Sequence, residues 1–260
     1  MRVLVVTAVA AEADSVAAGL ALAGYEHPGE EHTRNALVAG PAFTPSPPAR
    51  FGRAGHEIHV CPAGVGPAAA AAGTARALAL ALGSNPGPGS NPGPGYDLVV
   101  STGIGGGFPG VAPLGSLVVS STIVAADLGA GSPEGFIPVR ELGFGRQELS
   151  VPSSLGRRAT RALGAAHGPV LTVTTATGTA ERAAELLARH PHALAEAMEG
   201  FGVAETADVF GLPVLEIRAI SNEVGPRDRS AWRIGDALAA LTDAFAKLPP
   251  VLESWTPHDD

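Results

Sequence analysis

Several residue types are scarce in this 260-residue chain, and each scarcity narrows the kinds of protein that it can encode. Cys61 is the one cysteine, so no disulfide can form within the chain, which favours a reducing compartment such as the cytoplasm. Only Lys247 among 17 basic residues is a lysine, and the formal net charge of −8 disfavours nucleic acid and anionic membranes as partners. A small-molecule substrate is the expected partner.

Long apolar runs are also missing. The opening MRVLVVTAVAAEA is shorter than the roughly 15 to 30 residues of a secretory signal, and a core strand over residues 2–7 explains it better. The apolar segment 67–83 contains Arg76 and falls short of the ~18 apolar residues of a membrane span, so we expect a buried helix. Hydrophobic residues make up 45% of the chain and charged residues 16%, which predicts a single domain over residues 1–260.

Periodicity predicts strands that largely alternate with helices. The expected strands are 2–7, 57–61, 97–102, 116–125, 169–175 and 213–220; the expected helices are 11–23, 67–82, 152–167, 179–190, 200–210 and 235–248. This order favours an α/β fold whose mostly parallel or mixed sheet is covered by helices on both faces. The duplicated Gly/Pro/Ser/Asn stretch 84–95 predicts a loop insertion, and the proline-rich segment 40–53 predicts a second loop.

A glycine cluster, GIGGGF over residues 103–108, raises the question of a bound nucleotide. Phe108 stands where a dinucleotide fingerprint needs its third glycine, and another apolar strand follows instead of a helix, so we expect no such cofactor. The glycines let the backbone approach a flat ligand closely after strand 97–102. A glycine-rich turn without a ligand is the alternative.

Several spaced motifs resemble one superfamily across nearly the whole chain. In order they are VTAVAAEAD, PAGVGPAAAAAGTARAL, DLVVSTGIGGGFPGVAPLGSLVVSSTIVAADLGA and AEAMEGFGVAETADVFGLPVLEIRAISN, and together they resemble the purine nucleoside phosphorylases and nucleosidases. The resemblance implies a three-layer α/β/α nucleoside phosphorylase-like fold with a mixed central sheet, in a homodimer or higher homo-oligomer. DLGAGSPEGFIPVRELGFG and ISNEVGPRD resemble the futalosine hydrolase branch; the methylthioadenosine/S-adenosylhomocysteine nucleosidases are the alternative branch.

Two glutamates match the acids of this superfamily. Glu199 matches the residue that accepts hydrogen bonds from the ribose hydroxyls, and Met198 would lie against the sugar. Glu12 matches the acid that positions the attacking water. Taken alone, each glutamate could simply compensate the positive end of a helix. The motifs around both favour the functional interpretation.

Missing arginines indicate the nucleophile. Phosphorylases of the superfamily hold phosphate with arginine side chains and a hydroxyl beside the glycine-rich segment. Here no arginine precedes Gly103 in VVSTGIGGG, and Ile104 replaces the usual serine. Gly103, Ile104 and Gly105 are therefore candidate substrate contacts in an enzyme that uses water, and hydrolysis of an N-ribosidic bond is the expected reaction.

The base is assigned from ISNEVGPRD. Relatives that cleave adenine nucleosides carry an aspartate at the position of Asn222, whereas an amide can donate to O6 or N7 of a 6-oxopurine such as hypoxanthine. A turn asparagine that ends a strand is the alternative. Asp228 could supply an acid or cap the last helix, and Arg227 could meet a substrate carboxylate or form surface ion pairs.

The sequence gives less support to other classes of function. The eight histidines show no spacing typical of metal ligands, so we expect neither a metal nor a cofactor. A non-catalytic purine nucleoside sensor remains the alternative from another class, although a sensor has no need of the water-positioning acid at Glu12. The best-supported reading is hydrolysis of futalosine, an inosine derivative of menaquinone biosynthesis, to hypoxanthine and dehypoxanthinyl futalosine.

Overall fold

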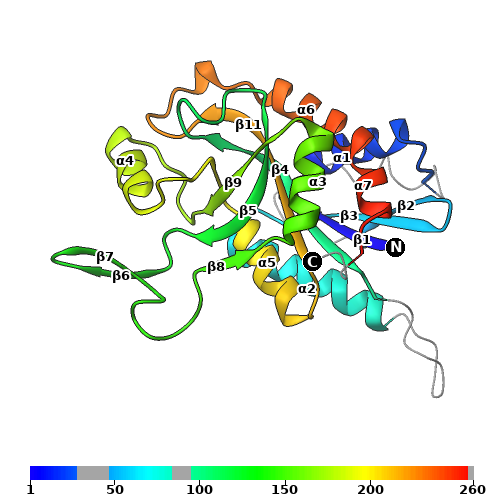
Figure 1. Ribbon diagram of the computed structural model, residues 1–260, viewed down its shortest axis with the longest axis horizontal. Helices are drawn as coiled ribbons and strands as arrows, with labels where there is room; N and C mark the ends of the chain where they lie inside the picture. The colour runs from blue at the N-terminus through cyan, green and yellow to red at the C-terminus, as the bar shows by residue number, and fades with distance from the viewer. Residues whose placement is uncertain (28–46, 84–94, 257–260) are drawn as a thin grey trace.

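The computed structural model describes residues 1–27, 47–83 and 95–256. Its central sheet joins β1 (Arg2–Thr7), β2 (Ala49–Arg53), β3 (His56–Pro62), β4 (Leu98–Gly107), β5 (Leu117–Ala125), β8 (Glu148–Ser150), β9 (Ala166–Thr172), β10 (Ala195–Ala197) and β11 (Val214–Glu223). A separate hairpin, β6 (Gly129–Ser132) with β7 (Gly135–Pro138), projects from the body of the molecule (Figure 1). The sheet is mixed, as the sequence predicts.

One end of the sheet closes on itself. The strand order is β10-β9-β5-β11-β4-β1-β3-β2, and β10 also pairs with β4, so β4, β11, β5, β9 and β10 form a ring. The other end, β1-β3-β2, stays open. Because β1, β3, β4 and β11 run parallel, their carboxyl ends meet at one edge, where α/β folds place their ligands.

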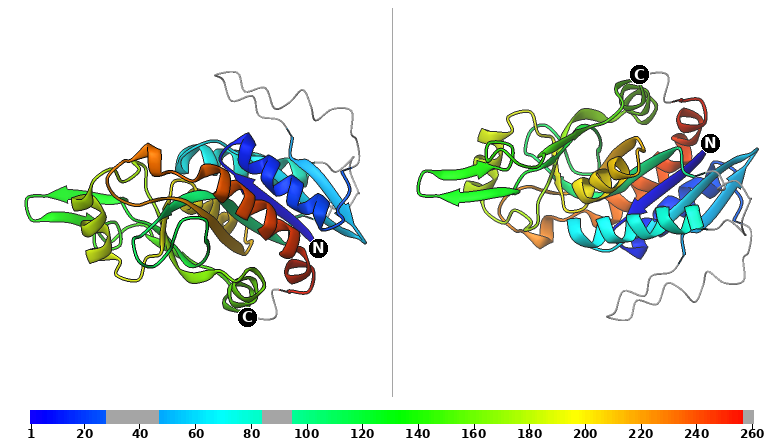
Figure 2. Two further views of the ribbon diagram at one scale, coloured as in Figure 1. Left: turned by 90° about the horizontal axis from the view of Figure 1, so that it is seen from above. Right: turned by 90° about the horizontal axis from the view of Figure 1, so that it is seen from below.

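Helices cover both faces of this sheet. They are α1 (Ala10–Leu22), α2 (Pro67–Gly83), α3 (Ser153–Leu163), α4 (Ala180–Arg189), α5 (Gly200–Val209), α6 (Ile234–Lys247) and α7 (Pro249–Glu253). Helices α1 and α6 pack together on one face, and α2 and α5 pack together on the other, as the two views of Figure 2 show. The strands between them read as apolar runs because they are buried on both faces; in β1 every residue after Arg2 is buried.

The predicted helices and strands are largely found, although β6, β7, β8 and α7 were not expected and four further points need correction. Strand β4 continues through the glycine cluster to Gly107, so the turn expected as the alternative there is wrong. Helix α3 ends at Leu163 rather than 167, because Gly164 adopts a left-handed conformation (φ 61°) that stops a helix. Residues 49–53 of the expected proline-rich loop form β2, and the three-residue β10 was not expected, because its Ala-Glu-Ala sequence carries no strand pattern.

Two expected loop segments lie outside the described residues. These are 84–94 of the predicted insertion 84–95, and 40–46 of the predicted loop 40–53. The flanking ends are described: α2 ends at Gly83, and β4 begins at Leu98. The expectation of a single domain over the whole chain therefore stays a prediction.

Candidate active site

The carboxyl end of β4 brings two charged side chains against its backbone. A Cβ atom on Gly103 would lie 2.5 Å from Glu12 Oε1 and 3.0 Å from Arg218 Nη1. Glycine is therefore the residue that leaves room for both groups at this point of the strand. At Gly103 the glycine lets these two protein side chains approach the strand, and the close approach of a flat ligand that the sequence suggests stays a prediction.

Glu12 is buried at the start of α1, directly after β1. Its Oε2 accepts hydrogen bonds from the backbone N–H groups of Ala8 (2.9 Å) and Val9 (3.2 Å), and its Oε1 accepts from Ile104 N (2.9 Å). Only 3% of the residue is exposed. Burial raises the pKa of Glu12, although the backbone hydrogen bonds and Arg218 oppose the rise. A carboxylate with four acceptor positions still has one for a further donor, such as water.

Glu199 lies at the junction between β10 and α5. Its Oε1 accepts from Gly66 N (3.1 Å), and its Oε2 accepts from Met198 N (3.3 Å) and faces Arg218 Nη1 (3.4 Å). The side chain makes no capping hydrogen bond to its own helix. Simple helix-end compensation therefore does not explain its orientation. Three of its four acceptor positions are used, so one is free for a ribose hydroxyl, and the long bonds to Oε2 (3.3 and 3.4 Å) are the weakest that a second hydroxyl would have to replace. Met198 is half-buried next to it.

Two charged residues at the centre of the site were not predicted. Arg218 and Glu216 are both fully buried in β11, and Arg218 Nε donates to Glu216 Oε1 at 2.9 Å. Arg218 Nη2 also donates to Ser101 Oγ (3.0 Å). Their signal was present in LEIRAIS, because two charges spaced by two residues in an apolar strand point to the same face. The sequence does not show which residues contact these two charges, so this pattern alone did not identify a site.

The charges of this group perturb one another. Burial raises the pKa of Glu216, and Arg218 opposes the rise. Burial alone would lower the pKa of Arg218, but the attraction of Glu216, Glu199 and Glu12 outweighs it, and the pKa is raised. Arg218 is therefore a permanent cation that three carboxylates share.

Asn222 lies at an irregularity of β11. The register between β11 and β4 shifts between Ile220 and Asn222, which places Asn222 opposite Gly106. Its Nδ2 donates to Glu223 O (3.0 Å), and its Oδ1 accepts from Ser221 Oγ (2.9 Å). These local bonds also suit a strand-ending asparagine. Asn222 as reader of the base therefore stays a prediction.

The remaining sequence candidates divide into near and distant residues. Ile104 and Gly105 belong to β4, beside Glu12, and the backbone of β10 approaches Gly105 closely: a Cβ there would lie 2.8 Å from Glu196 O. Asp228 is exposed and caps the 3₁₀ turn Arg229–Ala231: its Oδ1 accepts from Ser230 Oγ (2.6 Å) and from Ser230 N (3.0 Å), and these bonds, the side-chain one above all, lower its pKa. An exposed carboxyl with a lowered pKa is a poor proton donor at neutral pH. Asp228 caps this 3₁₀ turn and not the last predicted helix, α6, whose N-cap residue is Arg233, and its role as an acid stays a prediction.

Arg227 is also exposed, and it contacts an aromatic ring. Its guanidinium carbon lies 5.5 Å from the centre of the Trp232 ring, while that of Arg229 lies 5.9 Å from the same ring. Both distances suit a cation–π contact. The structure shows no hydrogen bond between Arg227 and the glutamates of the site, so its contact with a substrate stays a prediction.

The described part of the chain shows neither a metal-binding cluster nor a helix that could span a membrane. Among residues 1–27, 47–83 and 95–256, no group of three or more His, Cys, Asp or Glu side chains is arranged to hold a metal ion. None of the helices in those same ranges combines the length and the apolar character that crossing a bilayer requires.

Comparison with known proteins gives the class. The sequence matches the phosphorylase superfamily over residues 3–252, and the chain belongs to this superfamily. Solved 5'-methylthioadenosine/S-adenosylhomocysteine nucleosidases share the fold. The protein from Neisseria meningitidis has a TM-score of 0.70 at 20% identity, covering 98% of this chain and 99% of its own. The Helicobacter pylori protein likewise has a TM-score of 0.70, at 18% identity.

The sequence relatives are more specific. The protein of Streptomyces coelicolor named futalosine hydrolase is 53% identical over 267 residues, which covers 100% of both chains. The futalosine hydrolase of Acidothermus cellulolyticus is 42% identical over 250 residues, covering 94% of this chain and 89% of its own. The resemblance to the superfamily, the mixed three-layer fold and the closeness to the futalosine hydrolase branch are confirmed.

Proposed function

We propose that this protein, like the relatives named futalosine hydrolase, acts on futalosine, and that it hydrolyses the N-ribosidic bond and releases hypoxanthine in menaquinone biosynthesis. Full-length identity of 53% to a futalosine hydrolase carries the choice of substrate. The arrangement of Glu12 and Glu199 around Arg218 carries the chemistry, because departure of the base leaves a cationic ribosyl group that needs both water and negative charge.

Each glutamate has a separate task in the proposed reaction. Glu12 accepts a proton from the attacking water, for which its raised pKa makes it a better base than an ordinary carboxylate. Glu199 holds the ribose hydroxyls, with Met198 against the sugar. Asn222 donates to O6 or N7 of the base. The backbone of Gly103, Ile104 and Gly105 lines the same strand end.

The buried arginine sharpens the case for water over phosphate. The sequence argument rests on missing arginines near Gly103, yet Arg218 Nη1 lies close to that residue in space. Its Nε, Nη1 and Nη2 already face Glu216, Glu199 and Ser101. The Glu12 carboxylate beside it would also repel a phosphate dianion. Because its nitrogens are already engaged and Glu12 lies beside it, Arg218 does not form a phosphate site, and neutral water is the nucleophile that we propose.

One assay tests the proposal. The purified protein is incubated with futalosine, inosine and methylthioadenosine, each with and without phosphate, and free bases and sugars are separated by chromatography. We expect hypoxanthine and a free sugar from futalosine in phosphate-free buffer. A rate that rises from zero with phosphate, or adenine release as the main activity, would contradict the proposal.

We also expect a homodimer or higher homo-oligomer in the cytoplasm. Leu80 and Leu82 on α2 are exposed by 45% and 47%, which supports an apolar contact between copies of the chain. The buried thiol of Cys61 suits a reducing compartment. Light scattering after gel filtration tests the first expectation, with a Leu82→Glu variant as the probe of the α2 surface; a monomeric parent would contradict it.

A further inference from the structure

The site holds more negative charge than its single buried cation can balance. Glu216, Glu199 and Glu12 all act on Arg218, so the four side chains carry a formal charge of −2 when they are ionised. Arg218 and Glu216 are completely buried, and Glu12 and Glu199 are only 3% and 7% exposed. Water screens such charges poorly, so their sum acts strongly on any group that enters the site.

Glu216 is the member of this group whose position is hardest to explain by stability. Its Oε1 accepts from Arg218 Nε, but its Oε2 is buried and has no hydrogen-bond partner among the described residues. A buried carboxylate with an unpartnered oxygen costs free energy, and an apolar side chain of similar size is often at least as stable in such a place. This cost points to a role in function.

The packing around Glu216 excludes other side chains. Gly200, the first residue of α5, lies against the carboxylate, and a Cβ atom there would come within 2.2 Å of Oε1. Glu216 is thus enclosed between Arg218 and Gly200, the residue that follows Glu199 at the beginning of α5. Glu216 is 0% exposed, and Arg218 donates to it through Nε while Nη1 of the same guanidinium faces Glu199. Direct contact with a substrate is therefore not its role.

Arg218 has two opposite effects on the proposed reaction. Its guanidinium fixes Glu199 through a hydrogen bond, but its positive charge opposes the cationic ribosyl group that forms as the base leaves. We propose that Glu216 is a positioning residue and buried counter-charge, which orients Arg218 and cancels its charge so that Glu12 and Glu199 keep their negative potential toward the ribosyl cation. This inference rests on the proposed function.

Two substitutions separate charge from shape. Glu216→Gln keeps the acceptor for Arg218 Nε but removes the charge, whereas Glu216→Asp keeps the charge and shortens the side chain. Glu57→Gln is the matched control, since Glu57 makes an ion pair with Arg2 at 3.1 Å and is 55% exposed at the opposite end of the sheet. Each variant is checked by thermal unfolding and by its oligomeric state.

We expect the charge to decide the rate. Glu216→Gln should lower kcat on futalosine on the order of 10- to 100-fold with little change in KM. Its affinity for a transition-state mimic with a cationic nitrogen in the sugar ring should fall by a similar factor, while affinity for hypoxanthine should not change. Glu216→Asp should retain a clearly larger share of kcat, and Glu57→Gln should match the parent.

The pH dependence of kcat distinguishes a charge effect from a packing effect, because a change in packing alone would not shift its acidic limb. The charged groups that face Glu12 are Arg218 and, around it, Glu199 and Glu216. Removal of one negative charge from this group stabilises the ionised form of Glu12. The acidic limb of kcat should therefore move to lower pH in Glu216→Gln and stay in place in Glu57→Gln.

Each contrary outcome has a definite meaning. Equal losses in Glu216→Gln and Glu216→Asp, with no selective loss of the cationic mimic, would overturn the counter-charge and leave only a packing role. Parent-like kinetics in Glu216→Gln would overturn it as well. Failure of the proposed function is distinct, because the parent protein would then release no hypoxanthine from futalosine. If Glu216→Gln does not fold, kcat and binding of the mimic are compared between Glu216→Asp and the parent, and a selective loss of the mimic in Glu216→Asp, which keeps the charge, would overturn it.

Discussion

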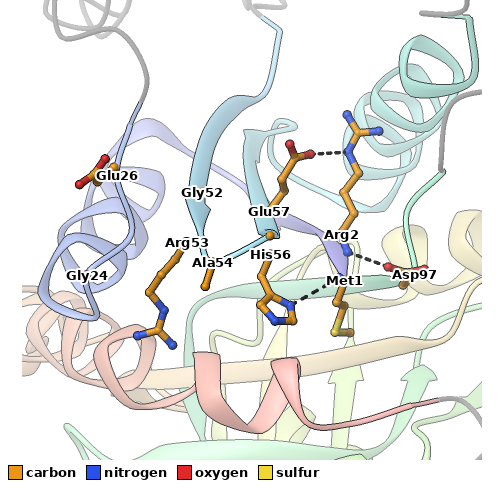
Figure 3. A pocket seen from close by; sticks show the side chains of 11 residues that line it. Met1, Arg2, Gly24, Glu26, Gly52, Arg53, Ala54, His56, Glu57 and Asp97 are labelled. Atoms are coloured by element: carbon orange, nitrogen blue, oxygen red, sulfur yellow. Dashed lines mark hydrogen bonds and ion pairs between the residues drawn. The ribbon is translucent and has the colours of Figure 1, made fainter.

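The parallel strands β1, β3 and β4 carry charged groups at both of their ends, but the two ends differ in their access to water. At the amino end, Arg2, Glu57, His56 and Asp97 surround an open pocket of about 710 Å³ (Figure 3). At the carboxyl end, Glu12 and Arg218 are buried against Gly103. Similar residue types therefore occupy environments with very different effective dielectric constants.

The interactions at the amino end involve side chains that keep some contact with water, since Arg2 and Glu57 are 18% and 55% exposed. Arg2 Nε lies 3.1 Å from Glu57 Oε2, and Arg2 N donates to Asp97 Oδ2 at 2.7 Å. Exposed pairs of this kind contribute about 0 to 1 kcal/mol. At the carboxyl end the same kind of pairing shifts pKa values and orients acids. Burial, more than the number of charges, distinguishes the candidate active site from the open pocket.

The largest test of this contrast removes the charge of one buried carboxylate. Glu12→Gln keeps the shape of the side chain but cannot take a proton from water, so turnover should fall by about 10²-fold or more with a modest change in KM. Steady-state kinetics of hypoxanthine release measure this. Near-parent turnover would remove Glu12 from the mechanism.

Asn222 offers the next largest effect. Asn222→Ala should lose about 2 to 4 kcal/mol of transition-state stabilisation if its amide donates to the base. Asn222→Asp places an acceptor against O6, so hypoxanthine release should collapse while any adenine nucleoside activity holds or rises. Rates with both bases are measured for the parent and the two variants. An unchanged preference for hypoxanthine in all three would make Asn222 a strand-ending residue only.

Glu199 should show a mixed effect. Its charge would hold ribose in both the ground state and the transition state, so Glu199→Gln should lower kcat and raise KM together. The loss in kcat/KM should be about 10- to 100-fold, as expected for hydrogen bonds to a charged group. Replacing the substrate by its 2'-deoxy analogue should lower kcat/KM by a smaller factor in the variant than in the parent. Equal losses would argue against a contact with the hydroxyl.

The pH dependence follows from the raised pKa of Glu12. The proposed base works when it is ionised, so activity should fall as pH decreases through a pKa above the ordinary carboxyl value of 4.5. The rate should recover when pH is raised again, because protonation of a carboxylate is reversible. The parent profile is measured with circular dichroism at each pH, and a profile that stays flat down to the ordinary range would contradict the assignment.

The smallest effect is expected at the open end of the sheet. Glu57→Gln breaks the exposed ion pair with Arg2, and stability should change by no more than about 1 kcal/mol. Turnover should be unchanged. Chemical denaturation and kinetics measure the two quantities. A loss of activity comparable to that of Glu12→Gln would show that the amino end also contributes to the reaction.

Sequence alone determined the class of fold, since strand and helix periodicities are local, and it proposed Glu12 and Glu199 as the two acids, since the motifs around them are distinctive. Tertiary structure decided what surrounds them. The ring closed by the three-residue β10, the glycine run as a strand, and the joining of Glu216 and Arg218 to acids from α1 and α5 depend on contacts between distant segments. Burial and charge coupling arise only when those segments meet, and the local trace, two charges in the apolar run LEIRAIS, does not show which acids they join.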